Sequence, residues 1–418
     1  MKVLVIGGGA REHAIIWKLS KSSKVSKLFC APGNAGIADL AECIDIKAED
    51  IDGLLEFALK NKVELTVVGP ETALVKGVVD LFEQNGLRIF GPNKKAAQLE
   101  GSKVFSKGFM NKHKIPTARY KTYSSIEKAI VELPHFDLPI VIKADGLAAG
   151  KGVIIAQTRQ AAVEAIYGIM GELKFGEAGK TIVIEEFLQG KEVSVMAFTD
   201  RNVAVPMVSA QDYKRAQDGD KGLNTGGMGA VSPALYYSAE AEETVRIDII
   251  NKTVHALKTE EIDFKGILYF GIMLTESGPK LLEYNVRFGD PETEVVLPRL
   301  QSDLVDIMNN VIDGTLDKVD IKWSKEKAVC VVMASGGYPE EYDIGCKIKG
   351  LEKIKEDAII FHAGTKFTND KLVTAGGRVL VISALGEDFE SARSEAYATI
   401  NKINFHNQHY RTDIAIYD

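Results

Sequence analysis

The sequence predicts a protein built from several α/β and α+β domains, and three observations support this fold class. Residues 1–100 alternate helices with short apolar strands at Val3–Ile6, Leu65–Val68 and Arg88–Phe90, which is typical of a parallel, doubly wound sheet. A new run of strands starts near the end of the chain, at Ala328–Ala334. The chain has 418 residues, 45% of them hydrophobic, which is enough for two to four domains.

The composition excludes several classes of protein. The 51 Lys and Arg against 58 Asp and Glu give a net charge of −7 with no basic block, so bulk nucleic-acid binding is not expected. The N-terminus lacks a signal-peptide layout, and no apolar run reaches the roughly 20 residues of a membrane span. The four cysteines are widely spaced and argue against a disulfide framework or zinc site: Cys30, Cys43, Cys330 and Cys346. We expect a soluble, cytoplasmic protein.

The pattern of elements changes after residue 103. Lys103 opens a helix that ends near His113, and three strands follow at Pro139–Lys143, Val153–Ala156 and Thr181–Glu185. This segment predicts a compact α+β unit.

The remaining elements are predicted from apolar runs and turn residues. In chain order they are a strand at Glu192–Phe198, a polar glycine-rich loop at Asp212–Gly229, a hairpin of Gly266–Thr275 and Lys280–Val286, a strand at Gly377–Ser383 and a helix at 388–402.

A glycine turn, Gly7-Gly8-Gly9, lies between the first strand and its helix. Backbone N–H groups at such a turn can bind a phosphate. As a dinucleotide-binding fingerprint the motif fails at the third glycine, where Glu12 stands. A phosphate site is our preferred interpretation; a plain tight turn and a nicotinamide site are the alternatives.

A second glycine cluster follows the strand that ends at Lys143. A lysine at a strand end can neutralise a phosphate, and the loop Gly146–Gly152 can close its amides over a triphosphate while excluding water. The loop is not a Walker motif, because no Ser or Thr follows Lys151. A loose hairpin loop with a surface lysine is the alternative.

The strand end Glu185-Glu186-Phe187-Leu188 can present backbone N–H and C=O groups to an adenine, and Glu192 downstream can hold the ribose hydroxyls. Adjacent glutamates at a strand end are more often solvated, so this motif is weak by itself.

Glu283 and Asn285 are two residues apart on a strand, so both project from one face. Carboxylate and amide oxygens suit Mg²⁺, which also takes substrate phosphates. The next eight residues, Arg287–Glu294, add one guanidinium and three carboxylates. A solvated charge run is the alternative, but Phe, Gly and Pro interrupt this one.

In order along the chain, these motifs resemble those of the ATP-grasp superfamily. The residues that carry this resemblance are Lys103, Lys143, the loop 146–152, Glu185–Leu188, Glu283 and Asn285. Within the superfamily the chain is most similar to the phosphoribosylamine–glycine ligase family. The distinguishing stretches are Gly7–His13, Gly69–Glu71, Gln211–Arg215, Asn224–Gly229 and, above all, Arg287–Glu294. The similarity extends to Ala375–Val379 and so covers essentially the whole chain.

The resemblance implies four structural units. They are an N-terminal Rossmann-like domain at 1–102, an ATP-grasp core at 103–120 and 190–325, a small ATP-grasp lid at 121–189 and a C-terminal α/β domain at 326–418.

The resemblance also implies an activity. ATP, the co-substrate, phosphorylates glycine, and 5-phosphoribosylamine attacks the glycyl phosphate to give glycinamide ribonucleotide, ADP and phosphate, the second step of de novo purine biosynthesis. Mg²⁺ or Mn²⁺ is the expected metal. The partners are then small molecules, with no nucleic acid and no membrane, and the chain is expected to be a monomer or weak homodimer.

Site residues are implied position by position. Those for ATP are Lys103, Lys143, Gly150, Lys151, Gly152, Glu185, Glu186, Phe187, Leu188 and Glu192. Those for the metal are Glu283 and Asn285. Those for glycine and the acyl phosphate, the catalytic set, are Asp212, Lys214, Arg215 and Arg287. Those for the remaining substrate contacts are Gly8, Gly9, Arg11, Gly69, Pro70, Glu71, Asp290 and Glu292.

One feature departs from the superfamily. Many members place a second metal carboxylate on the partner strand of the hairpin, whereas Gly271-Ile272-Met273 offers none here. The rival hypotheses are a different ATP-grasp ligase, a nicotinamide-dependent oxidoreductase and a non-enzymatic nucleotide-binding regulator.

Overall fold

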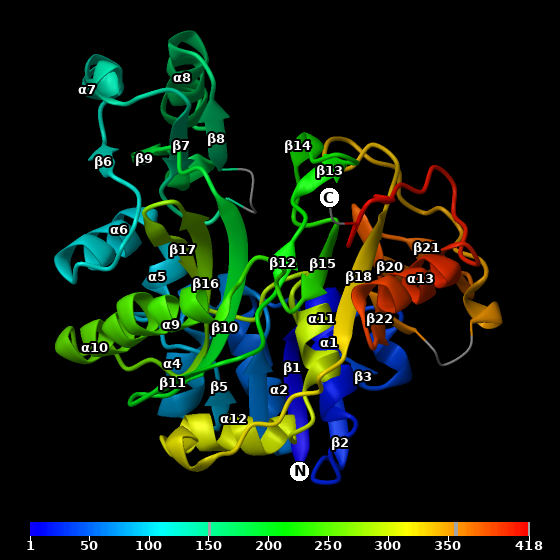
Figure 1. Cartoon of the computed structure of the whole chain (residues 1–418). Helices are drawn as coiled ribbons and strands as arrows, with labels where there is room; N and C mark the ends of the chain where they lie inside the picture. The colour runs from blue at the N-terminus through cyan, green and yellow to red at the C-terminus, as the bar shows by residue number, and fades with distance from the viewer. Residues whose placement is uncertain (149–151, 355–357, 417–418) are drawn as a thin grey trace.

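The computed structural model describes residues 1–148, 152–354 and 358–416. It confirms a mixed α/β protein in which a parallel N-terminal sheet is followed by antiparallel sheets (Figure 1). Among the described residues, no helix is long and apolar enough to cross a membrane.

The N-terminal sheet has five parallel strands in the order β3-β2-β1-β4-β5. Its elements are β1 (Lys2–Gly7), α1 (Ala10–Leu19), β2 (Lys27–Pro32), β3 (Glu42–Cys43), α2 (Ile51–Asn61), β4 (Leu65–Val68), α3 (Glu71–Lys76), α4 (Val78–Gln84) and β5 (Ile89–Phe90). β2 and β3 were not predicted from the sequence: Pro32 and the following Gly33 favour a loop, and β3 has only two residues. The predicted turns after β1, β4 and β5 share one edge of the sheet.

A second sheet of four antiparallel strands forms a separate projection in Figure 1. Its order is β6 (Tyr120–Tyr123), β9 (Ile182–Glu186), β7 (Ile140–Ala144) and β8 (Val153–Ala156). Ile142 and Ile184 lie on the face that packs in one apolar cluster with α7 (Ile126–Glu132) and α8 (Arg159–Ile166). Because side chains alternate along a strand, Lys143 and Glu185 lie on the opposite face.

The central sheet is antiparallel in the order β11-β10-β16-β17. Its elements and the helices around it are α5 (Gln98–Gly101), α6 (Lys103–Lys112), β10 (Lys191–Thr199), β11 (Ala204–Pro206), α9 (Ala239–Val245), α10 (Lys252–Thr259), β16 (Gly266–Thr275) and β17 (Gly278–Asn285). The predicted hairpin is confirmed as β16 and β17. Phe82 of α4 and Phe270 of β16 belong to one apolar cluster, so the N-terminal and central sheets share a core.

The C-terminal sheet has the order β12-β15-β18-β22-β19. Its strands and neighbouring helices are β12 (Gln211–Asp212), β15 (Gly229–Ser232), α11 (Thr293–Val296), α12 (Leu304–Asp313), β18 (Lys327–Ala334), β19 (Ile359–His362), β22 (Arg378–Gly386) and α13 (Phe389–Ile400). The predicted loop at 212–229 is wrong in part, since it contains a hairpin of β13 (Arg215–Gln217) and β14 (Lys221–Asn224). β15 joins the central segment to the C-terminal strands by pairing with β18.

Candidate functional site

The start of α6 is tied to the glycine loop that follows β7. The Ser102 hydroxyl caps the helix by accepting from Phe105 N, and it donates to Asp145 Oδ1 over 2.9 Å. Lys103 Nζ donates to the Gly146 carbonyl over 2.9 Å. Burial lowers the pKa of Lys103, and Glu283 offsets part of that change. The structure therefore brings Lys103 and the loop together, as predicted; Gly150 and Lys151 of that loop lie outside the described residues.

Lys143 of β7 and Glu185 of β9 form a buried ion pair. Lys143 Nζ lies 3.1 Å from Glu185 Oε2, and both side chains are buried. Burial disfavours the charged lysine, but Glu185 and Glu283 outweigh it and raise the pKa of Lys143. A second lysine, Lys107 of α6, lies 3.2 Å from the same carboxylate oxygen.

Glu283 and Asn285 lie at alternate positions of β17, facing the lysines. Burial disfavours ionisation of Glu283, but Lys143, Lys214 and Lys103 lower its pKa overall. The Asn285 amide oxygen accepts from Arg287 Nη2 over 3.1 Å.

These two oxygen donors fit Mg²⁺ in type and spacing. Within 1–148, 152–354 and 358–416 no three His, Cys, Asp or Glu side chains are grouped as a metal site. A metal here would accordingly complete its coordination with phosphate and water oxygens.

Lys214 lies between the acidic side chains of this region. It pairs with Glu192 of β10, and Asp212 and Glu283 are its other acidic neighbours. Burial opposes its charge, yet these carboxylates raise the pKa of Lys214. Burial, then Glu292, raises the pKa of Asp212 well above its usual range, although Lys214 acts in the other direction. Glu192 is thus held by a lysine in the region predicted to contact ribose.

Arg287 connects β17 to the N-terminal part of the chain. Its Nε lies 3.3 Å from Glu71 Oε2, and its Nη2 lies 3.0 Å from Glu100 Oε1. Burial disfavours ionisation of both carboxyl groups. Arg287 and Arg11 outweigh burial at Glu71 and lower its pKa, whereas burial outweighs Arg287 at Glu100 and raises the pKa there. A predicted catalytic arginine and a predicted substrate-binding glutamate are in this way in direct contact.

The glycine turn after β1 is filled by Glu12. Glu12 Oε2 accepts from Gly9 N over 2.6 Å, and Glu12 Oε1 lies 2.6 Å from Arg11 Nε. A Cβ at Gly69 would overlap the Glu12 carboxylate, so a larger residue there would displace Glu12 from its contacts with Gly9 and Arg11. Glu12 occupies the place of the third glycine of the dinucleotide fingerprint, and its carboxylate takes up the Gly9 N–H.

A cluster of acidic side chains follows Arg287. Arg378 Nη1 of β22 lies 3.0 Å from Asp290 Oδ1. Glu292 Oε1 accepts from the Ser194 and Tyr269 hydroxyls over 2.9 Å each.

Glu294 is fully buried at the end of this cluster. Neither of its carboxyl oxygens has a hydrogen-bond partner in the described part of the chain. Burial, then the neighbouring Asp290, raises the pKa of Glu294 well above its usual range.

Some predicted residues lie apart from these contacts. Arg215 donates to the Gly222 carbonyl within its own hairpin over 2.9 Å. Pro70 precedes α3 as its N-cap residue, and Leu188 is buried after β9. Gly152, at the start of β8, packs closely enough on Ala148 that a Cβ would not fit.

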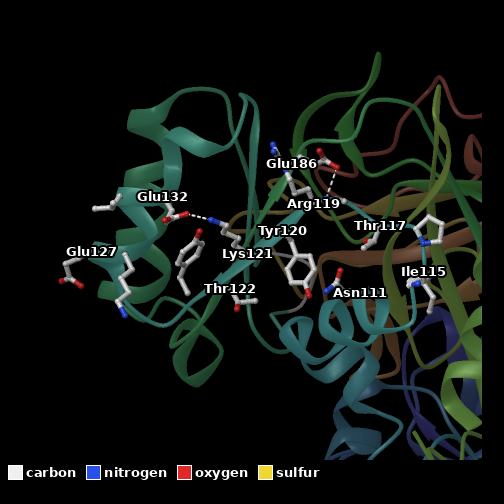
Figure 2. Close-up of a pocket in the computed structure, with 16 residues that line it drawn as sticks. Asn111, Ile115, Thr117, Arg119, Tyr120, Lys121, Thr122, Glu127, Glu132 and Glu186 are labelled. Atoms are coloured by element: carbon white, nitrogen blue, oxygen red, sulfur yellow. Dashed lines mark hydrogen bonds and ion pairs between the residues drawn. The ribbon is translucent and has the colours of Figure 1, made fainter. Parts of the chain in front are cut away.

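A groove of about 1160 Å³ is lined by the end of α6, the segment that follows it, β6 and α7 (Figure 2). Figure 2 shows Glu186 beside Arg119, whose backbone N–H donates to Glu186 Oε1 over 2.9 Å. Of the predicted site residues, Glu186 alone is among those lining this groove. The paired charges, and not the size of this groove, therefore mark the candidate site.

Several residues that were not predicted contact predicted ones, among them Lys107, Glu100 and Arg378, and Glu294 interacts electrostatically with the predicted Asp290. Lys107 could have been found, because it stands four residues after Lys103 and thus on the same face of the helix. Glu294 belongs to the Arg287–Glu294 stretch but was given no role. Arg378 belongs to the Ala375–Val379 stretch of the resemblance but was given no role. Glu100 carries no local signal, since the fold brings it to Arg287 from a distant part of the chain.

Comparison with known proteins identifies the family. Residues 1–100, 101–293 and 328–417 match, in turn, the N domain, the ATP-grasp (A) domain and the C domain of phosphoribosylglycinamide synthetase. The chain is 50% identical over 415 residues to phosphoribosylamine–glycine ligase from Caldanaerobacter subterraneus subsp. tengcongensis, covering 99% of each chain.

Solved structures give the same result. The crystal structure of phosphoribosylamine–glycine ligase from Thermotoga maritima has a TM-score of 0.88 and 37% identity, covering 99% of this chain and 100% of that one. The biotin carboxylase domain of Hydrogenobacter thermophilus 2-oxoglutarate carboxylase has a TM-score of 0.76 at 16% identity, covering 97% and 90%, and shares the fold. With all three domains matched in order, the chain belongs to the phosphoribosylglycinamide synthetase family of ATP-grasp ligases.

Proposed function

We propose that this enzyme joins glycine to 5-phosphoribosylamine through a glycyl phosphate intermediate, with ATP as the phosphoryl donor. The γ-phosphoryl group passes to a glycine carboxylate oxygen and ADP leaves. The amine nitrogen of phosphoribosylamine then attacks the acyl carbon, the C–O bond to phosphate breaks and the amine loses a proton. The products are glycinamide ribonucleotide, ADP and phosphate.

The observation that carries this proposal is the placement of opposite charges around one point. Lys143, Lys214 and Lys103 all act electrostatically on Glu283, although they come from three separate elements. A polyanion can replace part of this pairing, because the ammonium groups are held at fixed positions before it binds. We assign Lys103 and Lys143 to the ATP phosphates on this basis.

The ATP assignment extends along β9. The backbone of Glu185, Phe187 and Leu188 meets the adenine, and Glu192 meets the ribose. Glu192 is already paired with Lys214, so ribose hydroxyls would share an ordered carboxylate. Gly152, at the start of β8, is assigned to the triphosphate by the same resemblance, and exclusion of water there would protect an acyl phosphate from hydrolysis.

Glu283 and Asn285 would hold Mg²⁺ or Mn²⁺. When bound, the metal reduces the repulsion between the triphosphate and the glycine carboxylate. Asn285 would then exchange its contact with Arg287 for the metal. Glu283, placed beside three lysines, remains ionised and ready to bind a cation.

The acyl-transfer end is assigned to Asp212, Lys214 and Arg287. Arg287 is oriented by Glu71 and Glu100, so its guanidinium is fixed before glycine binds. Arg11, Gly8 and the Gly69–Glu71 turn lie at the edge of the N-terminal sheet, where ligands of doubly wound sheets bind. We assign the phosphoribosyl group to this edge.

The role of Arg215 rests on the resemblance alone. The position of Arg215 in a surface hairpin gives no further support for contact with glycine.

The test is phosphate release from ATP and Mg²⁺, with glycine and freshly made phosphoribosylamine added separately and together. Release that needs both substrates, with a stable amide product by mass spectrometry, is the expected result. Release driven by another acid or amine would overturn the substrate pair and keep the ligase assignment. ATP binding without release in any mixture would overturn the proposed reaction.

A further inference from the structure

Lys107 is a buried lysine that none of the site assignments uses. It lies on α6, one turn after Lys103, and its residue is 2% exposed. Its ammonium group lies 3.2 Å from Glu185 Oε2 and donates to the Thr117 hydroxyl over 2.7 Å. A buried ammonium is expensive unless charged or polar groups surround it, so its placement requires an explanation.

The charges around Lys107 do not balance. Lys107 and Lys143 approach the same oxygen of Glu185, at 3.2 and 3.1 Å. The other oxygen, Glu185 Oε1, is buried and has no hydrogen-bond partner among the described residues. Two ammonium groups thus share one oxygen of Glu185, and Glu283 is the second carboxylate that acts on both of them. With Lys103, which also acts on Glu283, three lysines face two carboxylates, and the free acceptor Glu185 Oε1 lies beside them. A ligand with both an anionic part and an N–H donor would satisfy both the lysines and this acceptor.

Lys107 also joins three segments of the fold. Glu185 and Lys143 belong to the four-stranded sheet β6-β9-β7-β8, whereas Lys107 belongs to a helix of the central part. The Thr117 hydroxyl that accepts from Lys107 donates in turn to the Leu281 carbonyl over 2.6 Å. Leu281 is on β17, two residues before Glu283. Figure 2 shows Thr117 in the segment between α6 and β6.

We propose that Lys107 is a positioning residue of the ATP site. Lys107 fixes the Glu185 carboxylate, and because Lys143 pairs with the same oxygen, Lys107 thereby sets the position of Lys143 relative to β17. Loss of the Lys107 ammonium leaves Glu185 and Lys143 as a simple pair, free to turn away from the central sheet. The nucleotide phosphates then meet a Lys143 ammonium group that is less well positioned, and the positive charge around it is reduced by one. This inference rests on the proposed ATP site.

The experiment measures the binding of a non-hydrolysable ATP analogue by calorimetry, together with steady-state kinetics, in five single variants and one double variant. Lys107→Met is expected to weaken analogue binding and raise KM for ATP about tenfold or more, while KM for glycine changes little. Lys107→Arg is expected to restore most of the affinity, because it keeps a charged donor toward Glu185. Lys112→Met is the matched control on the same helix, since Lys112 is exposed and pairs with Glu260; it is expected to bind like the wild type.

A double variant separates positioning from a direct or merely structural role. If Lys107 acts through Glu185, Lys107→Met combined with Glu185→Gln is expected to bind no more weakly than Glu185→Gln alone. Wild-type binding by Lys107→Met, or additive losses in the double variant, would overturn the inference. Lys107→Gln replaces Lys107→Met if the latter does not fold, with the same expectations.

Lys143→Met shows whether a negative result concerns Lys107 alone or the whole proposed ATP site. Weak binding by Lys143→Met together with normal binding by Lys107→Met would overturn the role of Lys107 alone. Normal binding by Lys143→Met would overturn the proposed ATP site and, with it, the inference.

Discussion

Two charged regions lie next to each other in this enzyme, and they have opposite excess charge. The lysine cluster contains Lys103, Lys107 and Lys143 around Glu185 and Glu283. The carboxylate cluster contains Asp212, Asp290, Glu292 and Glu294, with Arg378 and Lys214 as its cations. Each contains both buried and half-buried side chains, so burial alone does not distinguish them.

The difference between the clusters appears in the pKa of their carboxyl groups. Burial works against ionisation in both, but the lysines outweigh it and lower the pKa of Glu283, whereas burial, reinforced by the neighbouring Glu292 and Asp290, raises the pKa of Asp212 and Glu294. The sign of the neighbouring charge therefore decides which group stays ionised. The lysine cluster is suited to a polyanion and a metal, and the carboxylate cluster to groups that bring positive charge or protons.

The largest expected effect is at Glu283, where the two kinds of charge meet. Glu283→Gln is expected to lower kcat about 10³-fold, because it removes the one carboxylate of the proposed metal site. The fold is expected to survive, since the side chain lies outside the apolar clusters. The rate is measured across Mg²⁺ concentrations, with circular dichroism as the check on folding.

Glu276→Gln serves as the control for Glu283, because Glu276 is exposed in the turn of the same hairpin. A wild-type rate for Glu283→Gln at saturating Mg²⁺ would rule out the metal role and with it the contrast between the clusters.

Lys143→Met tests the lysine cluster directly. It removes a positive charge held by both Glu185 and Glu283, so ATP-analogue affinity is expected to fall about 10²-fold. Titration calorimetry measures this loss without turnover. Lys121→Met, an exposed lysine on the edge strand β6 paired with Glu132, is expected to change affinity by less than about twofold. Equal affinities of the two variants would contradict the proposed site.

Arg287→Lys sharpens the comparison at the boundary between the clusters. A lysine can pair with Glu71 or Glu100 but cannot reproduce both contacts of the guanidinium. We expect kcat to fall about tenfold with a smaller change in KM for ATP. A fall in ATP affinity at constant kcat would instead place Arg287 with the lysine cluster.

The sequence was sufficient for those parts of the site that lie within one motif. Glu283 and Asn285 are two apart on one strand, and Lys143 ends another, so periodicity and strand ends select them as candidates. The chain-wide order of motifs then gave the family. The short strand β2 was missed because its terminal Pro32 and the following glycine imitate a loop.

Partners from distant segments could not be predicted in the same way. Glu100 reaches Arg287 because α5 packs against β17, and Arg378 reaches Asp290 because β22 of the C-terminal sheet lies beside the segment after β17. Likewise, Glu12 was read as a departure from a glycine motif, and only the fold reveals that its carboxylate binds Gly9 N. Local pattern predicts which side chains share a face, while the charge balance of a buried cluster depends on packing between domains.

The smallest expected effect is on stability and concerns Glu294. Its folded-state pKa is raised by burial and by Asp290, so the folded protein binds this proton more tightly than the unfolded chain does. The stabilisation from that proton is complete below the unfolded pKa of about 4.3 and is lost as pH rises through the folded pKa.

Glu294→Gln tests this because the glutamine side chain stays neutral at every pH. Since neither carboxyl oxygen accepts a hydrogen bond from the described residues, the substitution breaks no such contact. The variant is expected to unfold about 1–4 °C higher than the wild type at pH 8, with the difference shrinking toward pH 4.5. Thermal unfolding at several pH values measures this, and Glu390→Gln, on the exposed face of α13, should show no such trend. A Glu294→Gln variant that is less stable at pH 8 than the wild type would mean that this carboxylate is ionised in the folded protein, and the contrast between the two clusters would then fail at its most buried member.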